Sequence, residues 1–176
     1  MIRDRKEIKK RPFVLVLVVC LATAYSIGQE KDIKGWRNAK WGMSEDELLS
    51  TFRGEAVRLD KISEWPDMFA SIWIKDYDIA GNNYDVFFQM DKKSKLLKQV
   101  LIGGKGKREY SFEFQKLEQM LTEKYGAPSY KTSSNIATKE AWNYPSTIIE
   151  LLTLHVINRF STLSLVYHPP EGSNKI

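Results

Sequence analysis

A helical motif that opens at Ser44 is the feature that most constrains the fold, because its start signals are complete and a similar motif recurs later. Ser44 and Glu47 have the spacing of a capping box, in which each side chain satisfies a backbone N–H of the other residue. Met43 and Leu48 have the spacing of a hydrophobic staple. The sequence therefore predicts a short helix over Glu45–Phe52.

The second helical motif spans Phe112–Tyr125 and is followed by Gly126-Ala127-Pro128, in which the glycine and the proline both oppose continuation of a helix. Each motif is followed by segments in which apolar and polar residues alternate, the pattern of half-buried strands. The clearest of these is Tyr84–Met90, which follows a turn at Gly81-Asn82-Asn83. Strands are predicted at 71–78, 84–90 and 95–102 after the first helix, and at 141–144, 146–157 and 161–167 after the second.

These segments predict an α+β fold built from two half-units, at about 33–102 and 110–168, each a helix followed by three strands. We expect them to form one antiparallel sheet with the helices on one face. Residues 55–70 are predicted to be a loop because Pro66 and scattered charges interrupt any periodicity. The other face of such a sheet would lie open to solvent or to a partner.

Residues 1–28 have the layout of a secretory signal peptide, with basic residues, an apolar run from Phe13 to Ala24, and then small or polar residues. Cleavage is expected after Ser26 or Gly28. The alternative is a membrane anchor that keeps residues 12–28 uncleaved, although a spanning helix needs about 20 apolar residues. We therefore predict an exported, periplasmic protein that would meet a membrane only through this segment.

After cleavage we expect a single domain over 29–168, which consists of the two half-units, and a flexible tail over 169–176. The only cysteine, Cys20, lies in the apolar run, so the domain would have no disulfide and no cysteine-ligated metal. A further alternative is lipidation of Cys20, but lipoprotein processing favours a small residue where Val19 stands.

The charge balance argues against a nucleic-acid partner. The whole chain has 27 Lys and Arg against 22 Asp and Glu, a net charge of +5. Residues 1–28 contain six of the basic and two of the acidic residues, which leaves 21 against 20, a net charge of +1. The domain therefore has no basic surplus with which to neutralise phosphates.

Short motifs on both half-units resemble those of SmpA/OmlA-type envelope lipoproteins: Gly42-Met43-Ser44 with Leu48 and Phe52, Leu121 with Tyr125-Gly126-Ala127-Pro128, and Trp142-Asn143-Tyr144. The chain is also similar to small exported bacterial proteins that carry a Lys-Trp-Gly-Met-Ser segment, here Lys40–Ser44. The resemblance implies the tandem α+β fold named after β-lactamase inhibitory protein. It also implies a non-enzymatic module that binds a protein or another envelope component.

The sequence singles out no catalytic residue, no metal ligand and no cofactor. His155 and His168 lack a second histidine or cysteine at ligand spacing. The segment Gly103–Arg108 lacks the spacing of a phosphate-binding loop, and we interpret it as a connector between the half-units. Anion binding at the start of the second helix is the alternative. The alternative function is a hydrolase-like periplasmic enzyme in which His155 pairs with Glu150 or Asp85.

The candidate partner-binding surface comprises Trp73, Lys75, Asp85, Phe87 and Gln89. On one side of its predicted strand, Trp73 lies between Ser71 and Lys75. In the same way, Phe87 lies between Asp85 and Gln89. If that side faces outward, the aromatic pair forms an exposed patch of the kind that marks interfaces. The alternative is a second buried layer beneath the long predicted loop.

Overall fold

The computed structural model describes residues 32–106, 109–156 and 160–172. The predicted signal segment 1–28, with Cys20 and the expected cleavage sites, lies outside the described residues. The strands of the described part are β1 (Gly35–Trp36), β2 (Ala39–Lys40), β3 (Ala56–Glu64), β4 (Met68–Ile79), β5 (Asn82–Asp91), β6 (Leu97–Gly104), β7 (Tyr130–Ser133), β8 (Ala137–Asn143), β9 (Ile148–Val156) and β10 (Phe160–His168). The helices of the described part are α1 (Glu45–Thr51) and α2 (Ser111–Tyr125).

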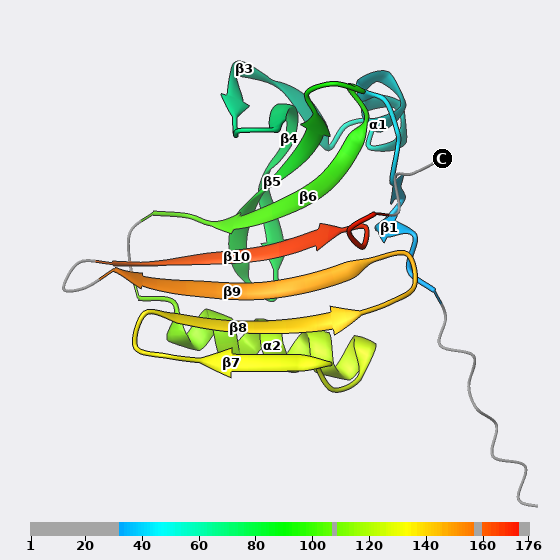
Figure 1. Ribbon diagram of the computed structural model, residues 1–176. Coiled ribbons are helices and arrows are strands. Elements are labelled where there is room, and N and C mark those ends of the chain that lie inside the picture. The colour runs from blue at the N-terminus through cyan, green and yellow to red at the C-terminus, as the bar shows by residue number, and fades with distance from the viewer. Residues whose placement is uncertain (1–31, 107–108, 157–159, 173–176) are drawn as a thin grey trace, which may run out of the picture. The chain divides into compact units, whose positions relative to one another are not determined.

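One antiparallel sheet of eight strands organises the domain, in the order β3-β4-β5-β6-β10-β9-β8-β7, and β1 and β2 pair separately. The order is symmetric, because two meanders of four strands meet where β6 pairs with β10 (Figure 1). At this junction Leu101 lies opposite Val166, and Val100 lies opposite Tyr167. Helix α1 precedes the first meander and α2 precedes the second, so each half is a helix followed by four strands.

The prediction of an α+β fold with three strands in each half is therefore wrong. Strands hold 52% of the described residues and the two short helices hold 16%, which makes this a sheet-dominated fold. Most of the segment predicted to be a loop is β3, and Pro66 lies in the turn that follows it. Strands β3 and β7 lie at the two edges of the sheet, where most of their side chains are exposed. Exposure removes the apolar alternation that identifies a half-buried strand.

The two predicted helices are present, and their ends lie within one residue of the predicted ones. The capping box of α1 is confirmed, because the backbone N–H of Glu47 donates to Ser44 Oγ over 3.4 Å and that of Ser44 donates to Glu47 Oε2 over 2.8 Å. Helix α2 ends at Gly126, whose φ of 82° suits glycine. The carbonyl of Gly126 accepts a hydrogen bond of 2.8 Å from Trp142 Nε1, which ties the helix end to the sheet.

The hydrophobic core lies between one face of the sheet, called here the inner face, and the two helices. A buried row crosses this face from strand to strand, at Ile72, Phe88, Val100, Tyr167, Ile149 and Trp142. Helix α1 adds Leu48 and its C-cap residue Phe52 to the same core, and α2 adds Leu117 and Leu121. Burial of these side chains is the main term that favours folding.

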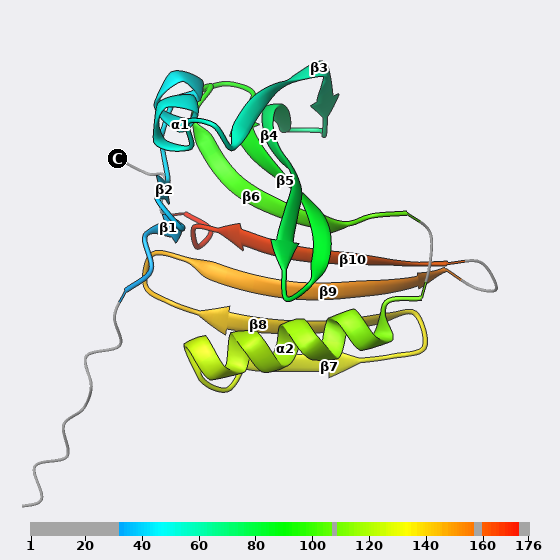
Figure 2. The same ribbon diagram turned by 180° about the vertical axis from the view of Figure 1, so that it is seen from behind.

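The sheet is strongly twisted, so its first half curls toward the inner side. Figure 2 shows α2 lying over β7 and β8, and the β4–β5 hairpin crossing β10 and β9 toward that helix. The opposite face of the sheet, called here the open face, is covered by neither described helix (Figures 1 and 2). Among the described residues no helix combines the length and the apolarity needed to cross a membrane.

Candidate functional site

A row of apolar side chains crosses the middle of the open face on four adjacent strands. Trp73 on β4 lies opposite Phe87 on β5, Phe87 lies opposite Leu101 on β6, and Leu101 lies opposite Val166 on β10. All four side chains are half-buried, although no described helix covers them. At the sheet edge, Val57 lies opposite Trp73 and is 51% exposed. Trp73, Phe87, Leu101 and Val166, called here the apolar row, form a continuous apolar strip.

The aromatic pair at one end of the apolar row is well ordered by stacking. The ring centroids of Trp73 and Phe87 are 5.9 Å apart and the ring planes differ by 25°. An offset stack of this kind contributes about 0.5–1.5 kcal/mol beyond the area that it buries. Both rings lie on the open face rather than in a second buried layer, because the segment predicted to cover them is the edge strand β3.

The other three residues of the predicted surface differ in their exposure. Lys75 is exposed and Asp85 is half-buried beside the apolar row. Gln89 is only 1% exposed, and its side-chain oxygen accepts a hydrogen bond of 2.6 Å from Gln99 Nε2. A partner would therefore contact Gln99 rather than Gln89, because Gln89 is buried. The five predicted residues lie in one region of the structure, and all of them except Gln89 are accessible to a partner.

A charged cluster borders the apolar row where β4 and β5 approach their hairpin. Lys105 Nζ pairs with Asp76 and lies 2.9 Å from Asp85 Oδ1. The hydrogen bond from Lys105 lowers the pKa of Asp76, and both carboxylates raise the pKa of Lys105, Asp76 more than Asp85. Lys105 thus contacts two carboxylates, and Lys75 also acts on Asp76, so positive and negative charges alternate along this border.

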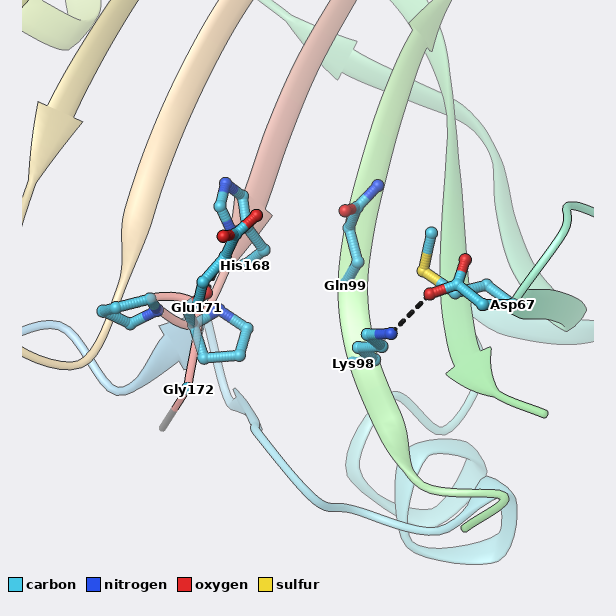
Figure 3. Close-up of a pocket in the computed structure, with 9 residues that line it drawn as sticks. Asp67, Lys98, Gln99, His168, Glu171 and Gly172 are labelled. Atoms are coloured by element: carbon cyan, nitrogen blue, oxygen red, sulfur yellow. Dashed lines mark hydrogen bonds and ion pairs between the residues drawn. The ribbon is translucent and has the colours of Figure 1, made fainter. Parts of the chain in front are cut away.

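A cavity of about 420 Å³ lies at the other end of the open face, between β6 and the end of β10 (Figure 3). Its lining residues are Asp67, Met68, Lys98, Gln99, His168, Pro169, Pro170, Glu171 and Gly172. Figure 3 shows His168 and Glu171 on one side of it and Gln99 and Lys98 on the other. Lys98 Nζ donates to Asp67 Oδ2 over 2.6 Å, and this contact raises the pKa of Lys98.

Beside this cavity, His168 belongs to a charged cluster on β8, β9 and β10. Lys139 Nζ lies 2.7 Å from Glu150 Oε1, and His168 Nε2 lies 3.8 Å from the same oxygen. The contact with His168 is the largest influence on Glu150 and, together with Lys139, lowers the pKa of that carboxyl to about 2 against the opposing effect of burial. The same contact raises the pKa of His168, so the imidazole is charged more readily than a free histidine.

The histidine–carboxylate pairs expected for a hydrolase are not brought together. His155 and Glu150 are five residues apart on β9, so their side chains point to opposite faces. His155 Nδ1 lies 3.0 Å from Ser161 Oγ, and Asp85 is bound by Lys105. In the described ranges, no group of three or more His, Cys, Asp or Glu side chains is placed to hold a metal ion.

Sequence reasoning missed the pairing of His168 with Glu150 and the cavity beside it. Glu150 lies among apolar residues on its side of the predicted strand, and His168 follows the end of the strand predicted at 161–167, so the sequence holds no clear signal for this contact. Their contact depends on the register in which Val166 lies opposite Glu150, and register between β9 and β10 is not written in either strand alone.

The chain matches no protein-family model, no curated protein and no solved structure to which it was compared. The resemblance to SmpA/OmlA-type lipoproteins therefore remains an expectation from short motifs, and the candidate site rests on its geometry.

Proposed function

We propose that this chain is an exported envelope protein whose open face binds a protein or another envelope component, without catalysing a reaction. The observation that carries the proposal is the apolar row, a continuous strip of half-buried side chains on a face that neither described helix covers. A contiguous apolar strip on an uncovered sheet face is typical of interaction surfaces.

The surroundings of the apolar row support the same function. Interfaces combine an apolar, aromatic centre with a polar rim that stays partly hydrated. Here Trp73 and Phe87 are the aromatic anchors, and the rim contains the Lys105–Asp85 pair on one side and the Lys98–Asp67 pair on the other. Tryptophan is enriched among the residues that dominate binding energy, so Trp73 is the expected anchor.

The proposal is tested by capturing the partner with the full chain from a chemically crosslinked envelope fraction. Trp73→Ala is expected to reduce capture at least about tenfold, because an anchor of this kind contributes about 2 kcal/mol or more. Val166→Gln changes the other end of the apolar row and is expected to reduce capture as well.

The matched control is Phe112→Ala, which removes a side chain that is 70% exposed at the start of α2, away from the open face. Capture should survive this change. Urea unfolding of each variant verifies that it remains folded. A partner that is retained by Trp73→Ala and Val166→Gln but lost by Phe112→Ala would place binding elsewhere and contradict the proposal.

Export is a separate part of the proposal, and it rests on the order of basic, apolar and small residues over 1–28. N-terminal sequencing of the protein from the cells that make it tests this part. A start near Gln29 is the expected result. A chain that retains residues 12–28 would instead support the anchored alternative.

A further inference from the structure

A second cavity, of about 260 Å³, lies on the inner side of the sheet, away from the open face. The walls are the β4–β5 hairpin and β1 on one side and α2 on the other, and the floor is formed by β6 and β10 (Figure 2). Its lining residues are Trp36, Arg37, Tyr77, Asp78, Ile79, Ala80, Ile102, Leu117, Met120, Leu121, Lys124, Tyr125, Leu165 and Tyr167. The cavity lies where the two halves of the fold meet and leave space between them.

Beside the cavity, a contact joins the two halves of the fold. Lys116 Nζ on α2 donates to the carbonyl of Ala80, at the tip of the β4–β5 hairpin, over 2.5 Å. This bond holds the hairpin against the helix, so the distance between the two walls is set by the fold. Trp36 and Tyr77 pack edge to face with 5.5 Å between their centroids, which fixes the orientation of the aromatic wall.

A few polar side chains line this mainly apolar space, among them Tyr125 and Tyr167. Burial raises the pKa of Tyr167 well above its usual value, as does the nearby Tyr125 hydroxyl to which it hydrogen-bonds. The phenol of Tyr167 therefore stays protonated, and its hydrogen is donated to Tyr125. A few fixed polar groups in an apolar cavity are the usual composition of a small-molecule site.

The lining of the cavity includes two cations, Lys124 and Arg37. Lys124 Nζ lies 4.9 Å from the ring centroid of Tyr125 and forms no ion pair with a carboxylate of the described residues. Arg37, the other cation of the lining, is already paired with Glu55 at 2.7 Å. Asp78, the one carboxylate of the lining, is exposed and accepts a hydrogen bond from the backbone N–H of Gly81 at the hairpin turn. An anionic group on a ligand would therefore find Lys124 available.

We propose that this cavity binds a small monocyclic aromatic carboxylate, with its ring among the aromatic and aliphatic walls and its carboxylate toward Lys124. The size agrees, because an apolar cavity of about 150 Å³ accommodates benzene, and 260 Å³ leaves room for a carboxylate arm. The charge agrees, because a carboxylate near an ammonium forms a charge-assisted hydrogen bond. This site is independent of the open face and of the partner proposed for it.

Calorimetric titration of the full chain with 4-hydroxyphenylacetate tests the proposal, with the neutral 4-hydroxyphenylacetamide as the matched probe. A ligand of this size is expected to bind with a dissociation constant of about 1 mM. The amide should bind about tenfold more weakly. Lys124→Gln should lower the affinity for the acid to that for the amide, without changing the affinity for the amide.

Met120→Trp fills the cavity from a position that is 39% exposed, and it should abolish binding of both probes while the protein remains folded. Lys93→Gln removes an exposed lysine of a turn outside both proposed sites and should change neither affinity. The proposal is overturned if the acid does not bind saturably, if acid and amide bind equally well, or if Lys93→Gln weakens the acid as much as Lys124→Gln does.

Discussion

Trp73 and Phe87 lie directly opposite each other on neighbouring strands, and their rings stack with 5.9 Å between the centroids. The pair sits on the face of the sheet that neither described helix covers, and each side chain is half-buried. Stacking therefore orders two large aromatic groups without removing them from solvent. Such a pair presents apolar area to a partner at a small further cost in side-chain entropy.

The stack predicts an energetic coupling between the two residues. A double-mutant cycle with Trp73→Ala and Phe87→Ala should give a coupling of about 1 kcal/mol in the free energy of unfolding. Urea denaturation of the four proteins measures it. The same cycle with Phe87→Ala and Phe112→Ala is the control, because Phe112 is on α2 and should show no coupling. Additive effects of the Trp73 and Phe87 substitutions would mean that the rings do not stabilise each other.

The sequence predicts the elements with strong local signals and misses those without them. Ser44, Glu47 and Gly126 act through residues close in sequence, and the helix ends that they predict are correct. Strands β3 and β7 are missed because edge strands expose their side chains and lose the alternation that burial imposes. Their absence from the prediction is the reason that the fold class was wrong.

For the candidate site, the sequence identifies the aromatic residues but not what surrounds them. Trp73 and Phe87 are recognisable because polar neighbours flank both. The contacts of Gln89 with Gln99 and of Glu150 with His168 join different strands. Such contacts depend on the register between neighbouring strands, which is not encoded locally.

Gly104 is predicted to be intolerant of a side chain because Tyr110 packs against it. A Cβ atom at Gly104 would lie 2.8 Å from the ring of Tyr110, which is fully buried. Gly104→Ala should therefore destabilise the protein by about 1–3 kcal/mol, the usual cost of overpacking. Gly103→Ala is the matched control, since no atom lies within 4 Å of a Cβ there. Equal effects of the two substitutions on the urea midpoint would contradict this packing.

The buried carboxylate of Glu140 is predicted to depend on Lys131 from the edge strand β7. Lys131 Nζ lies 2.5 Å from Glu140 Oε1 and 2.7 Å from Glu118 Oε1 on α2, so one ammonium ties β7, β8 and the helix together. Lys131→Met should cost about 2 kcal/mol, less than the 3–5 kcal/mol of a fully buried pair, because half of Lys131 is exposed.

Glu140→Gln in the Lys131→Met background should recover most of the lost stability, because it removes the uncompensated charge. Burial raises the pKa of Glu140, so the folded state binds its proton more readily than the unfolded state does. The cost of Lys131→Met should consequently shrink as the pH falls. Lys93→Met, at an exposed turn, is the control. A cost that is independent of pH would show that Glu140 is not the group responsible.

His168 and Glu150 predict opposite pH dependences of stability. The pKa of His168 is raised in the folded state, so its stabilisation is present below about pH 6.5 and is lost as the pH rises through the folded-state pKa. The pKa of Glu150 is lowered to about 2, so its stabilisation is present above its usual pKa of 4.5 and is lost as the pH falls toward 2.

An NMR titration of the His168 ring in the native protein and in Glu150→Gln separates this contact from other effects. The pKa of His168 should fall toward its usual value of 6.5 when the carboxylate is removed. Lys98→Gln, which changes the same cavity without touching Glu150, should leave the titration nearly unchanged. A His168 titration that is identical in the native protein and in Glu150→Gln would exclude the contact.

Photo-crosslinking in intact cells that make the protein tests whether the open face binds a partner. A photoreactive amino acid is placed at Phe87 on the open face or at Phe112 on α2, and the crosslinked species are compared. A discrete crosslinked partner is expected from position 87, and Trp73→Ala should remove it. The same partner should not be crosslinked from position 112. The same partner from both positions, or from position 112 alone, would contradict binding at the open face.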